Sequence, residues 1–320
     1  MQTKEFKLGS QTVKIDTGLI AKQANASVTV EIDGTVILGT LVASLEPNTR
    51  DFFPLTVNYN EKSYAAGKIP GSFFKREGRP SEKETLISRL IDRPLRPLFA
   101  ATYNQEVQIV LTLVSYNPEI DPEVPALIAA STCVKLAGLP FNGTLGAVKV
   151  GYLDNEYILN PTSSQLETSL LDLTVAGTNN AVLMVESEAK ELTEKEMLDA
   201  VNFGHDKMQD IIKAIDELVA DMGVNAMEAA PAEDNSELYN SIKTKYGNQI
   251  SEAYQITIKH DRYEKLSELK EDIMSKEVSD DDDNSDKLSV VFNDLKKDIV
   301  RERILSGEKR IDGRDSSTVR

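Results

Sequence analysis

The chain has 320 residues, 40% of them hydrophobic and 28% charged, and a formal net charge of -16. This length is typical of more than one domain, and the negative charge excludes a surface that attracts nucleic acid everywhere. The lone Cys133 excludes an internal disulfide framework and indicates a reducing, cytoplasmic location, and no run approaches the ~18 apolar residues of a membrane span.

The first 60 residues predict a series of β-strands. Short runs alternate polar and apolar residues, and glycine-bearing pairs and triplets between them have good turn chemistry. A segment without clear periodicity, residues 64–80, follows and predicts a loop. The expected strands are Glu5–Leu8, Thr12–Thr17, Ser27–Ile32, Val36–Ser44 and Phe52–Tyr59.

A helix with a clear start follows this loop. Ser81 and Glu84 form the S-x-x-E pattern of a capping box. Pro94 predicts the end of the helix at Arg93, because a proline disfavours helical geometry in the residue before it. The expected apolar stripe of the helix consists of Leu86, Ile87, Leu90 and Ile91.

The elements up to about residue 225 mix strands and helices in the order of an α+β domain. A strand is expected at Val107–Val114 and a helix at Glu123–Leu136. A second capping box, Thr193 with Glu196, opens a long amphipathic helix. Two strand pairs are expected between these helices, at 146–153 with 156–159 and at 171–175 with 181–186.

The sequence changes character after residue 225. Residues 224–236 read as a linker, and residues 237–305 are charge-rich with a helical period and no strand signal. The acidic run 279–286 lacks the glycine and glutamate spacing of an EF-hand, and it predicts a solvated loop between helices. Residues 306–320 have alternating charges and no core of their own, so we expect them to open a further domain.

Basic residues concentrate between residues 68 and 96. This window holds eight basic and four acidic residues in an acidic chain, so it would attract a polyanion locally. Guanidinium groups match phosphate oxygens, and neighbouring aromatic rings stack on unpaired bases for about 1–3 kcal/mol per base. The candidate residues for binding single-stranded nucleic acid are Phe73, Phe74, Lys75, Arg76, Arg79, Arg89, Arg93 and Arg96.

Local chemistry also permits a simpler interpretation of this window. Arginines on a helix are mostly solvated, and four acidic residues are available to pair with them. The Phe73-Phe74 pair would fit equally well into a domain core. The acidic residues are Glu77, Glu82, Glu84 and Asp92.

The chain resembles bacterial polynucleotide phosphorylase over nearly its whole length. The resemblance is carried, in order, by DFFPLTVNYNEKSYAAGKIPGSFFKREGRPSEKETLISRLIDRPLRPLF, PFNGTLGAVKVGY, LDLTVAGTNNAVLMVESEAKELTEKEML and GEKRIDGRD. It implies an α+β fold of the RNase PH-like (ribosomal protein S5 domain 2-like) type, followed by a small all-α domain. The implied domains are a first RNase PH-like domain with its C-terminal helix at 1–225, an all-helical domain at 226–305, and the start of a second, truncated RNase PH-like domain at 306–320.

The resemblance also implies a function. In that family three chains form a ring, and a loop with two phenylalanines and two basic residues lines its channel. The candidate residues named above would therefore bind single-stranded RNA, the loop residues in the channel and the helix arginines near the same path. The implied reaction is attack of inorganic phosphate, the co-substrate, on the 3′-terminal phosphodiester with magnesium as cofactor. The implied assembly is a homotrimer with partners from an RNA-degradation complex. The resemblance implies no association with a membrane.

We do not expect the phosphorolytic site in this chain. In the family's catalytic copy of the domain, a serine-rich turn at a helix N-terminus holds phosphate, and two aspartates six residues apart hold magnesium. The turn here, Pro118–Glu123, has two prolines and three carboxylates, which disfavour phosphate. The aspartate positions fall on Leu166 and Asp172, and one carboxylate is a weak magnesium site. The catalytic and metal-binding residues are therefore expected beyond Arg320.

Two functional hypotheses follow. In the first, the chain is the RNA-binding portion of a polyribonucleotide nucleotidyltransferase that degrades single-stranded RNA 3′ to 5′, and residues 1–320 alone are inactive. In the alternative, it is a non-catalytic RNA-binding ring subunit of an exosome-like assembly, complete in itself. The RIDGRD sequence favours the first hypothesis, because it resembles the opening of another RNase PH-like domain.

Overall fold

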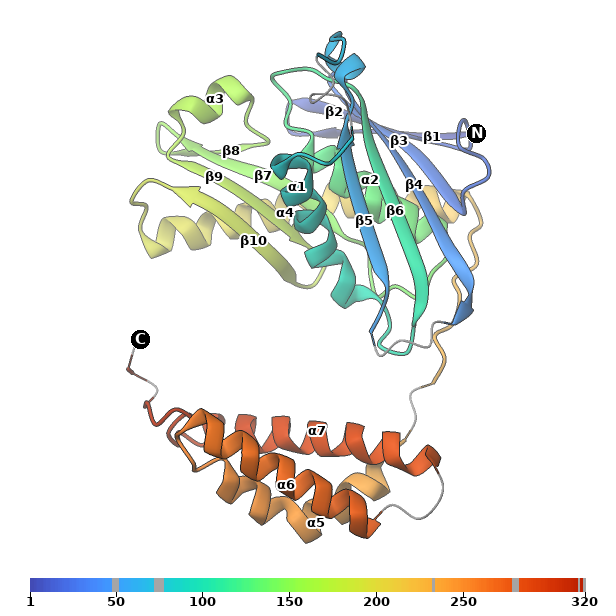
Figure 1. Cartoon of the computed structure of the whole chain (residues 1–320). Helices are drawn as coiled ribbons and strands as arrows, with labels where there is room; N and C mark the ends of the chain where they lie inside the picture. The colour runs from blue at the N-terminus through green and yellow to red at the C-terminus, as the bar shows by residue number, and fades with distance from the viewer. Residues whose placement is uncertain (48–51, 72–77, 232–233, 278–281, 316, 319–320) are drawn as a thin grey trace. The chain divides into compact units, whose positions relative to one another are not determined.

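The computed structural model describes residues 1–47, 52–71, 78–231, 234–277, 282–315 and 317–318. They form two compact units, Met1–Pro231 and Ala232–Arg320, which we call the mixed unit and the helical unit (Figure 1). Each unit has a hydrophobic core of its own, as is typical of separate domains.

The larger sheet of the mixed unit begins as an antiparallel meander. Its first four strands pair in chain order, and the strand order is β1-β2-β3-β4-β6-β5. The last two strands pair in parallel, which requires the chain to cross over the sheet between them. The strands are β1 (Gln2–Leu8), β2 (Gln11–Thr17), β3 (Ala26–Ile32), β4 (Thr35–Pro47), β5 (Leu55–Glu61) and β6 (Gln105–Ser115).

The smaller sheet follows in the chain and is antiparallel throughout. Its strand order is β10-β9-β7-β8, so β10 and β8 are its edges. A short helix, α3 (Ser163–Thr168), connects β8 to β9. The strands are β7 (Gly146–Leu153), β8 (Glu156–Leu159), β9 (Leu171–Gly177) and β10 (Val182–Ala189).

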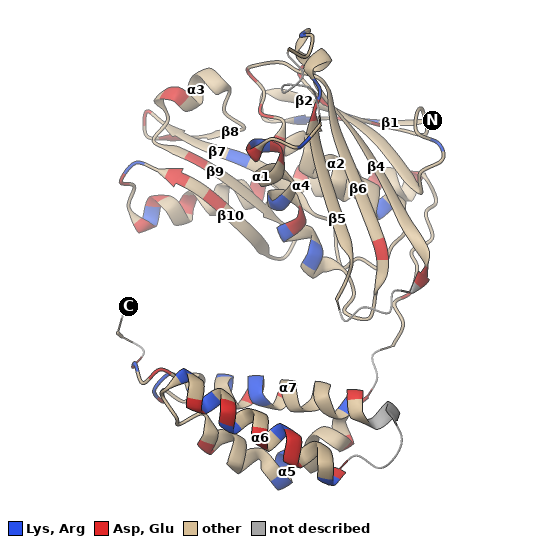
Figure 2. Ribbon diagram, viewed as in Figure 1, with Lys and Arg blue, Asp and Glu red and all other residues tan. Residues whose placement is uncertain are grey.

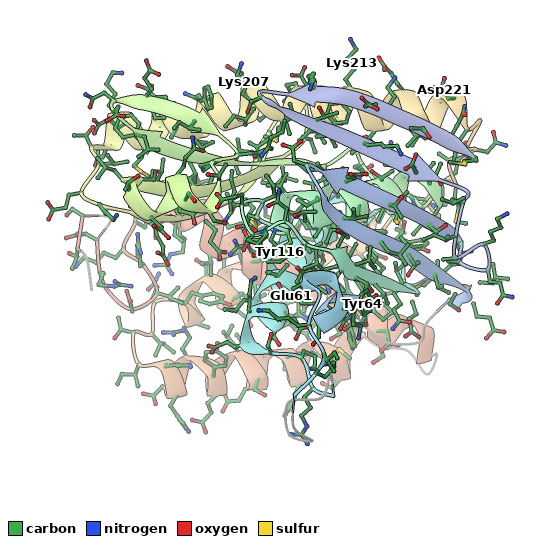
Figure 3. The ribbon with its side chains drawn as sticks, turned by 90° about the horizontal axis from the view of Figure 1, so that it is seen from above. Glu61, Tyr64, Tyr116, Lys207, Lys213 and Asp221 are labelled. Atoms are coloured by element: carbon green, nitrogen blue, oxygen red, sulfur yellow. The ribbon has the colours of Figure 1, made fainter. Side chains whose placement is uncertain are left out.

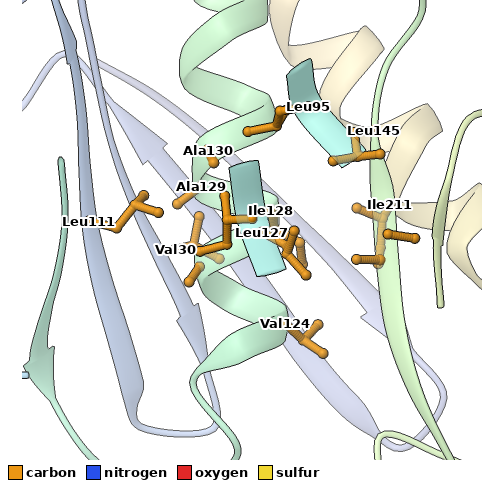
Figure 4. Close-up of a cluster of buried hydrophobic side chains, with 14 of the residues drawn as sticks. Val30, Leu95, Leu111, Val124, Leu127, Ile128, Ala129, Ala130, Leu145 and Ile211 are labelled. Carbon is orange, nitrogen blue, oxygen red and sulfur yellow. The ribbon is translucent and has the colours of Figure 1, made fainter. Parts of the chain in front are cut away.

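Helix α2 (Glu123–Leu136) forms the centre of the mixed unit. It packs on β3 and β4 of the larger sheet and on β7 of the smaller sheet, and it is buried from Val124 to Val134. Apolar residues on all sides suit a helix in such a position. Figure 4 shows Leu127 and Ile128 of α2 among buried side chains from neighbouring elements. Cys133 lies on the same helix and is 0% exposed.

Two further helices complete the mixed unit. Helix α1 (Glu82–Leu95) lies in the crossover and packs on β5, and α4 (Glu194–Asp221) packs on β7 and β9. Both helices begin with the capping boxes that the sequence predicts. In each box a hydroxyl accepts from a backbone N–H while the N3 glutamate accepts from the cap's N–H.

The predicted end of α1 at Arg93 is wrong. The helix continues through Pro94 to Leu95 and then tightens into the 3-10 turn η3 (Arg96–Leu98). A proline in the last turn removes only one helical hydrogen bond, and burial of both Pro94 and Leu95 favours continuation. The predicted apolar stripe is also wrong at Leu86, which is 59% exposed.

The predicted strands exist, but several of their ends differ. The strand expected at Phe52–Tyr59 runs from Leu55 to Glu61, and β4 continues past Ser44 to Pro47. These ends depend on pairing with β6, and a partner strand extends a ladder beyond the local propensity. The sequence interpretation also missed α3, which begins with a capping box of Thr162 and Gln165.

The first part of the predicted linker lies against the mixed unit. The N–H of Met227 donates to the carbonyl of Gly138 over 2.7 Å. The hydroxyl of Thr102 donates to the carbonyl of Ala230, also over 2.7 Å. Hydrogen bonds that involve the linker backbone thus hold the chain to the mixed unit as far as Ala230.

The helical unit contains α5 (Ser236–Ala253), α6 (Lys259–Glu277) and α7 (Asp282–Leu305). Their apolar faces meet in a core that includes Ile250, Ile273 and Phe292. Helix α7 begins at Asp282, so the predicted acidic loop is wrong for residues 282–286, and residues 279–281 lie outside the described residues. Among the described helices, none is both long and apolar enough to cross a membrane.

Candidate nucleic-acid interface

Among the predicted RNA-binding residues that the structure describes, Arg89 and Arg93 lie on α1 and Arg96 lies on η3. Phe73, Phe74, Lys75 and Arg76 lie outside the described residues. Arg79 is exposed two residues before the cap of α1. The charge distribution around α1 is shown in Figure 2.

The start of α1 is anchored to the larger sheet. Glu84 accepts a hydrogen bond from the N–H of Ser81 over 2.6 Å and a second from the N–H of Glu61, at the end of β5, over 2.7 Å. Burial alone would raise the pKa of Glu84, and these two backbone hydrogen bonds outweigh it and lower the pKa. The start of α1 is therefore fixed to the end of β5.

The surface near this fixed point carries further polar groups. Lys83 pairs with Glu61 over 2.8 Å, and the hydroxyl of Tyr59 donates to the same carboxylate over 3.1 Å. Figure 3 shows Glu61 close to Tyr64 and Tyr116, whereas Lys207 and Lys213 extend from α4 elsewhere on the mixed unit. These two lysines provide a comparison for experiments on the predicted RNA surface.

The two arginines of α1 have different surroundings. Arg89 is exposed. Arg93 pairs with Glu186 of β10 over 2.6 Å, and both side chains are about half exposed. An exposed ion pair contributes about 0–1 kcal/mol, so it leaves Arg93 free to exchange its partner for a phosphate.

Arg96 is engaged within the protein. Its guanidinium donates to Asp92 over 2.6 and 3.1 Å and to the backbone carbonyls of Phe53 and Leu55 over 2.9 and 3.0 Å. It also lies 5.8 Å from the centroid of the Phe53 ring. These contacts tie η3 to the segment before β5. RNA binding by Arg96 stays a prediction. In the structure its guanidinium is used for hydrogen bonds within the protein.

The positions that the resemblance assigns to phosphate and magnesium meet at Lys149. This lysine of β7 has a side chain only 7% exposed, and its Nζ lies 2.6 Å from Asp121, 3.2 Å from Glu123 and 3.3 Å from Asp172. Asp121 lies in the turn before α2, Glu123 is the first residue of α2, and Asp172 belongs to β9. The structure therefore brings the predicted turn and the predicted aspartate together around one ammonium group.

The electrostatics of this cluster follow from burial and charge. Burial alone would lower the pKa of Lys149, but the attraction of Asp121 and Glu123 outweighs it and raises the pKa. Burial raises the pKa of Glu123, and the charge of Asp121 adds to that rise. Three carboxylates sharing one cation explain both directions.

These residues do not fit phosphate or magnesium. The carboxylates repel an anion, and the ammonium of Lys149 fills the position between them that a cation would need. In the described part of the chain, no group of three His, Cys, Asp or Glu side chains is arranged to hold a metal ion. The sequence interpretation missed Lys149, although a lone lysine in the buried strand GAVKVGYL is a signal of a paired internal charge.

Three family models match the chain in order. Residues 9–140 match the 3′ exoribonuclease family, domain 1, and residues 143–207 match domain 2 of the same family. Residues 237–315 match the RNA binding domain of polyribonucleotide nucleotidyltransferase. The first two matches lie in the mixed unit and the third lies in the helical unit.

A solved structure of similar fold is the crystal structure of rice (Oryza sativa) Rrp46. It is 14% identical in sequence, with a TM-score of 0.53, and the match covers 67% of this chain and 96% of that chain. At this identity the likeness concerns the fold alone, and it agrees with the RNase PH-like α+β fold expected from the sequence. The chain therefore belongs to the 3′ exoribonuclease (RNase PH) family, with the domains of the N-terminal part of a polyribonucleotide nucleotidyltransferase.

Proposed function

We propose that this chain is the RNA-guiding portion of a polyribonucleotide nucleotidyltransferase. In this proposal the loop before α1 and the exposed arginines of α1 hold single-stranded RNA. A second RNase PH-like domain, which residues 306–320 would open, breaks the 3′-terminal phosphodiester with inorganic phosphate and magnesium. The protein acts in the cytoplasm as a homotrimeric ring, together with partners of RNA degradation.

The Lys149 cluster is the observation that supports RNA binding by the first domain and catalysis by a second domain. The positions that would hold phosphate and metal in a catalytic copy of the fold are occupied by a buried ammonium and its three carboxylates. If the first domain only binds RNA, phosphorolysis takes place in another copy of the RNase PH-like domain. The RNA-binding domain matched by residues 237–315 supports the same substrate class.

The alternative is a non-catalytic ring subunit of an exosome-like assembly, and in it the first domain would also be inactive. Residues 237–315, however, match a domain named for polyribonucleotide nucleotidyltransferase. This match favours the enzyme over the isolated ring subunit.

Changing Arg76 and Arg79 together to alanine is expected to weaken single-stranded RNA binding. For single strands, the slope of log K against log salt changes by about 0.7 per phosphate contact, so two lost contacts flatten it by about 1.4. Relative to equal affinities at 1 M salt, this lowers the affinity about 25-fold at 0.1 M salt. Fluorescence anisotropy with a labelled oligoadenylate over a range of salt concentrations measures both quantities.

The matched control changes Lys207 and Lys213 to alanine. It removes the same charge from α4 (Figure 3), and we expect the salt slope of this variant to stay that of the parent chain. Equal slopes for the parent and the Arg76/Arg79 variant would show that these arginines do not contact RNA. Separately, release of nucleoside diphosphates from oligoadenylate and phosphate by residues 1–320 would overturn the assignment of catalysis to another domain.

A further inference from the structure

The helical unit contains an open groove of about 1240 Å³ between α6 and α7. Its walls are one face of each helix, because the lining residues recur at helical spacing from Lys259 to Lys270 and from Phe292 to Arg301. At 1.5 Å of rise per residue, each wall extends over roughly 15 Å. Small-molecule pockets usually measure about 300–1000 Å³, so the groove fits a segment of a macromolecule.

The interior of the groove is apolar. Leu266 and Phe292 form its deepest part and are 8% and 1% exposed. Val300 of α7 also lines the groove and is partly exposed. Covering exposed apolar surface is favourable, so the interior favours a partner with an apolar face.

The charged side chains that line the groove are mostly basic. Among the described lining residues, Glu264 is the one carboxylate. None of the six lysine and arginine side chains named next forms an ion pair with another described residue. They are Lys259, Arg262 and Lys270 from α6 and Lys296, Lys297 and Arg301 from α7.

The acidic residues of α7 are used on another face of the helix. Asp298 accepts a hydrogen bond from the hydroxyl of Tyr239 on α5 over 2.8 Å. Glu302 pairs with Lys243, also on α5, over 3.4 Å. Helix α7 therefore turns acids towards α5 and bases towards the groove, and Figure 2 shows basic residues recurring along this helix.

Two of the cations are buried or half-buried without a carboxylate to neutralise them. Arg262 is 5% exposed, and its guanidinium donates to the backbone carbonyls of Ile256 and Ile311 over 2.7 and 3.0 Å. Lys296 is half-buried, with Nζ 4.9 Å from the centroid of the Phe292 ring. Buried cations are ordinarily paired with an anion, so these two indicate that the occupant of the groove carries negative charge.

We propose that this groove docks an acidic amphipathic helix of another protein. The apolar face of that helix lies on Leu266, Phe292 and Val300, and its carboxylates pair with the basic side chains at the edges of the groove. A helix of about ten residues matches the length of the walls, and helices in such grooves bind through anchors at i, i+3 or i+4, and i+7. The basic lining makes an acidic helix the complementary partner. This docking does not depend on the RNA-guiding role proposed for the mixed unit.

The lining favours a peptide over a nucleic acid. Bases stack on accessible aromatic faces, whereas Leu266 and Val300 are aliphatic and Phe292 is buried. Tyr263 is 62% exposed, but its ring already has the ammonium of Lys259 at 5.7 Å from its centroid. The apolar face of a helix uses such an interior, and a hydrated phosphate backbone does not.

The test uses the 320-residue chain and a fluorescein-labelled helical peptide of about 14 residues. The peptide has leucine at i, i+3, i+4 and i+7 and glutamate at the flanking positions. We expect it to bind in a fluorescence anisotropy titration, and we expect a peptide with glutamine in place of each glutamate to bind at least about 10-fold more weakly. Equal binding of the two peptides, or binding of neither, overturns the proposal.

Changing Lys297 and Arg301 together to glutamine is expected to weaken binding of the glutamate peptide about 10-fold, the effect of losing two exposed ion pairs. Both side chains are exposed, so the fold should be retained. Lys265 and Lys276, changed to glutamine, are the control, because each pairs with a carboxylate of its own helix and neither lines the groove. The control should keep the parent affinity, and an equal loss in both variants would contradict docking in the groove.

Val300→Asp examines the apolar contact. A carboxylate inside the groove repels the acidic helix, and we expect the glutamate peptide to bind more than about 10-fold more weakly. Val290→Asp is the matched control, because Val290 is 53% exposed on the same helix and does not line the groove. Thermal unfolding followed by circular dichroism checks that both variants fold, and the Lys297/Arg301 variant remains decisive if Val300→Asp does not.

Competition with RNA separates the two classes of ligand. An oligouridylate with the same net charge as the glutamate peptide should not displace that peptide from the parent chain. Displacement would assign the groove to RNA, and the proposal of a docked helix would be wrong. The proposed function is tested by the Arg76/Arg79 variant in the mixed unit, so its success or failure is independent of the result at the groove.

Discussion

Replacing Lys149 by methionine is expected to lower the free energy of unfolding of the mixed unit by about 3–5 kcal/mol. Methionine keeps most of the side-chain volume but leaves Asp121, Glu123 and Asp172 without their shared cation. Removing one partner from a buried charge cluster lowers the stability by more than the whole cluster contributes to it. The reason is that the remaining buried charges are left without a compensating charge. Urea unfolding followed by far-ultraviolet circular dichroism measures the effect.

The free energy of unfolding that the Lys149→Met variant loses should be smaller at pH 5 than at pH 8. In the parent chain the raised pKa of Lys149 means that its contribution is fully present below the ordinary lysine pKa of 10.5 and is lost as the pH rises through the folded value. In the variant, the three carboxylates face one another without their shared cation, so protonation relieves their repulsion as the pH falls. We therefore expect the difference between parent and variant to shrink from pH 8 to pH 5. A difference that is constant over this range would contradict the electrostatic explanation.

Lys195→Met is the matched control for this substitution. Lys195 also pairs with a carboxylate, Asp199, over 2.5 Å, but its side chain is 84% exposed. Water compensates both charges when such a pair is broken. The control should unfold at nearly the same urea concentration as the parent chain.

Leu127→Ala is expected to lower the free energy of unfolding of the mixed unit by about 2–5 kcal/mol. Leu127 is 1% exposed on α2, and this helix packs against both sheets, so the surroundings can collapse only partly around the lost atoms (Figure 4). The same urea experiment measures the loss. A loss below about 1 kcal/mol would mean that the site repacks, since surface substitutions have effects of that size.

Leu198→Ala provides the comparison on another helix of the same unit. Leu198 lies on α4 and is 60% exposed, so little apolar area is lost and alanine favours the helix. We expect a change within about 0.5 kcal/mol of the parent. The contrast separates the loss of core packing from the loss of a leucine as such.

The sequence predicts well those features that local chemistry determines. The capping boxes at Ser81 and Thr193 are complete within four residues, and both helices begin where these boxes place them. The bounds of α2 agree with the prediction because apolar residues and nearby breakers define them. Pro94 misled the prediction, because the burial of its neighbours depends on the tertiary fold.

The Lys149 cluster could not be read from the sequence in the same way. Lys149 is 28 residues from Asp121 and 23 from Asp172, and only the pairing of β7 with β9 and the position of α2 bring them together. The RNA contacts of the residues predicted on the loop, on α1 and on η3 stay a prediction.

The burial of Cys133 supplies a way to follow one unit alone. Cys133 is the only thiol in a chain without tryptophan, and burial raises its pKa to about 12. A thiol reagent can therefore react only after α2 has left its place between the sheets. The rate of alkylation reports the opening of the mixed unit, while the helical unit, which has no cysteine, contributes no signal.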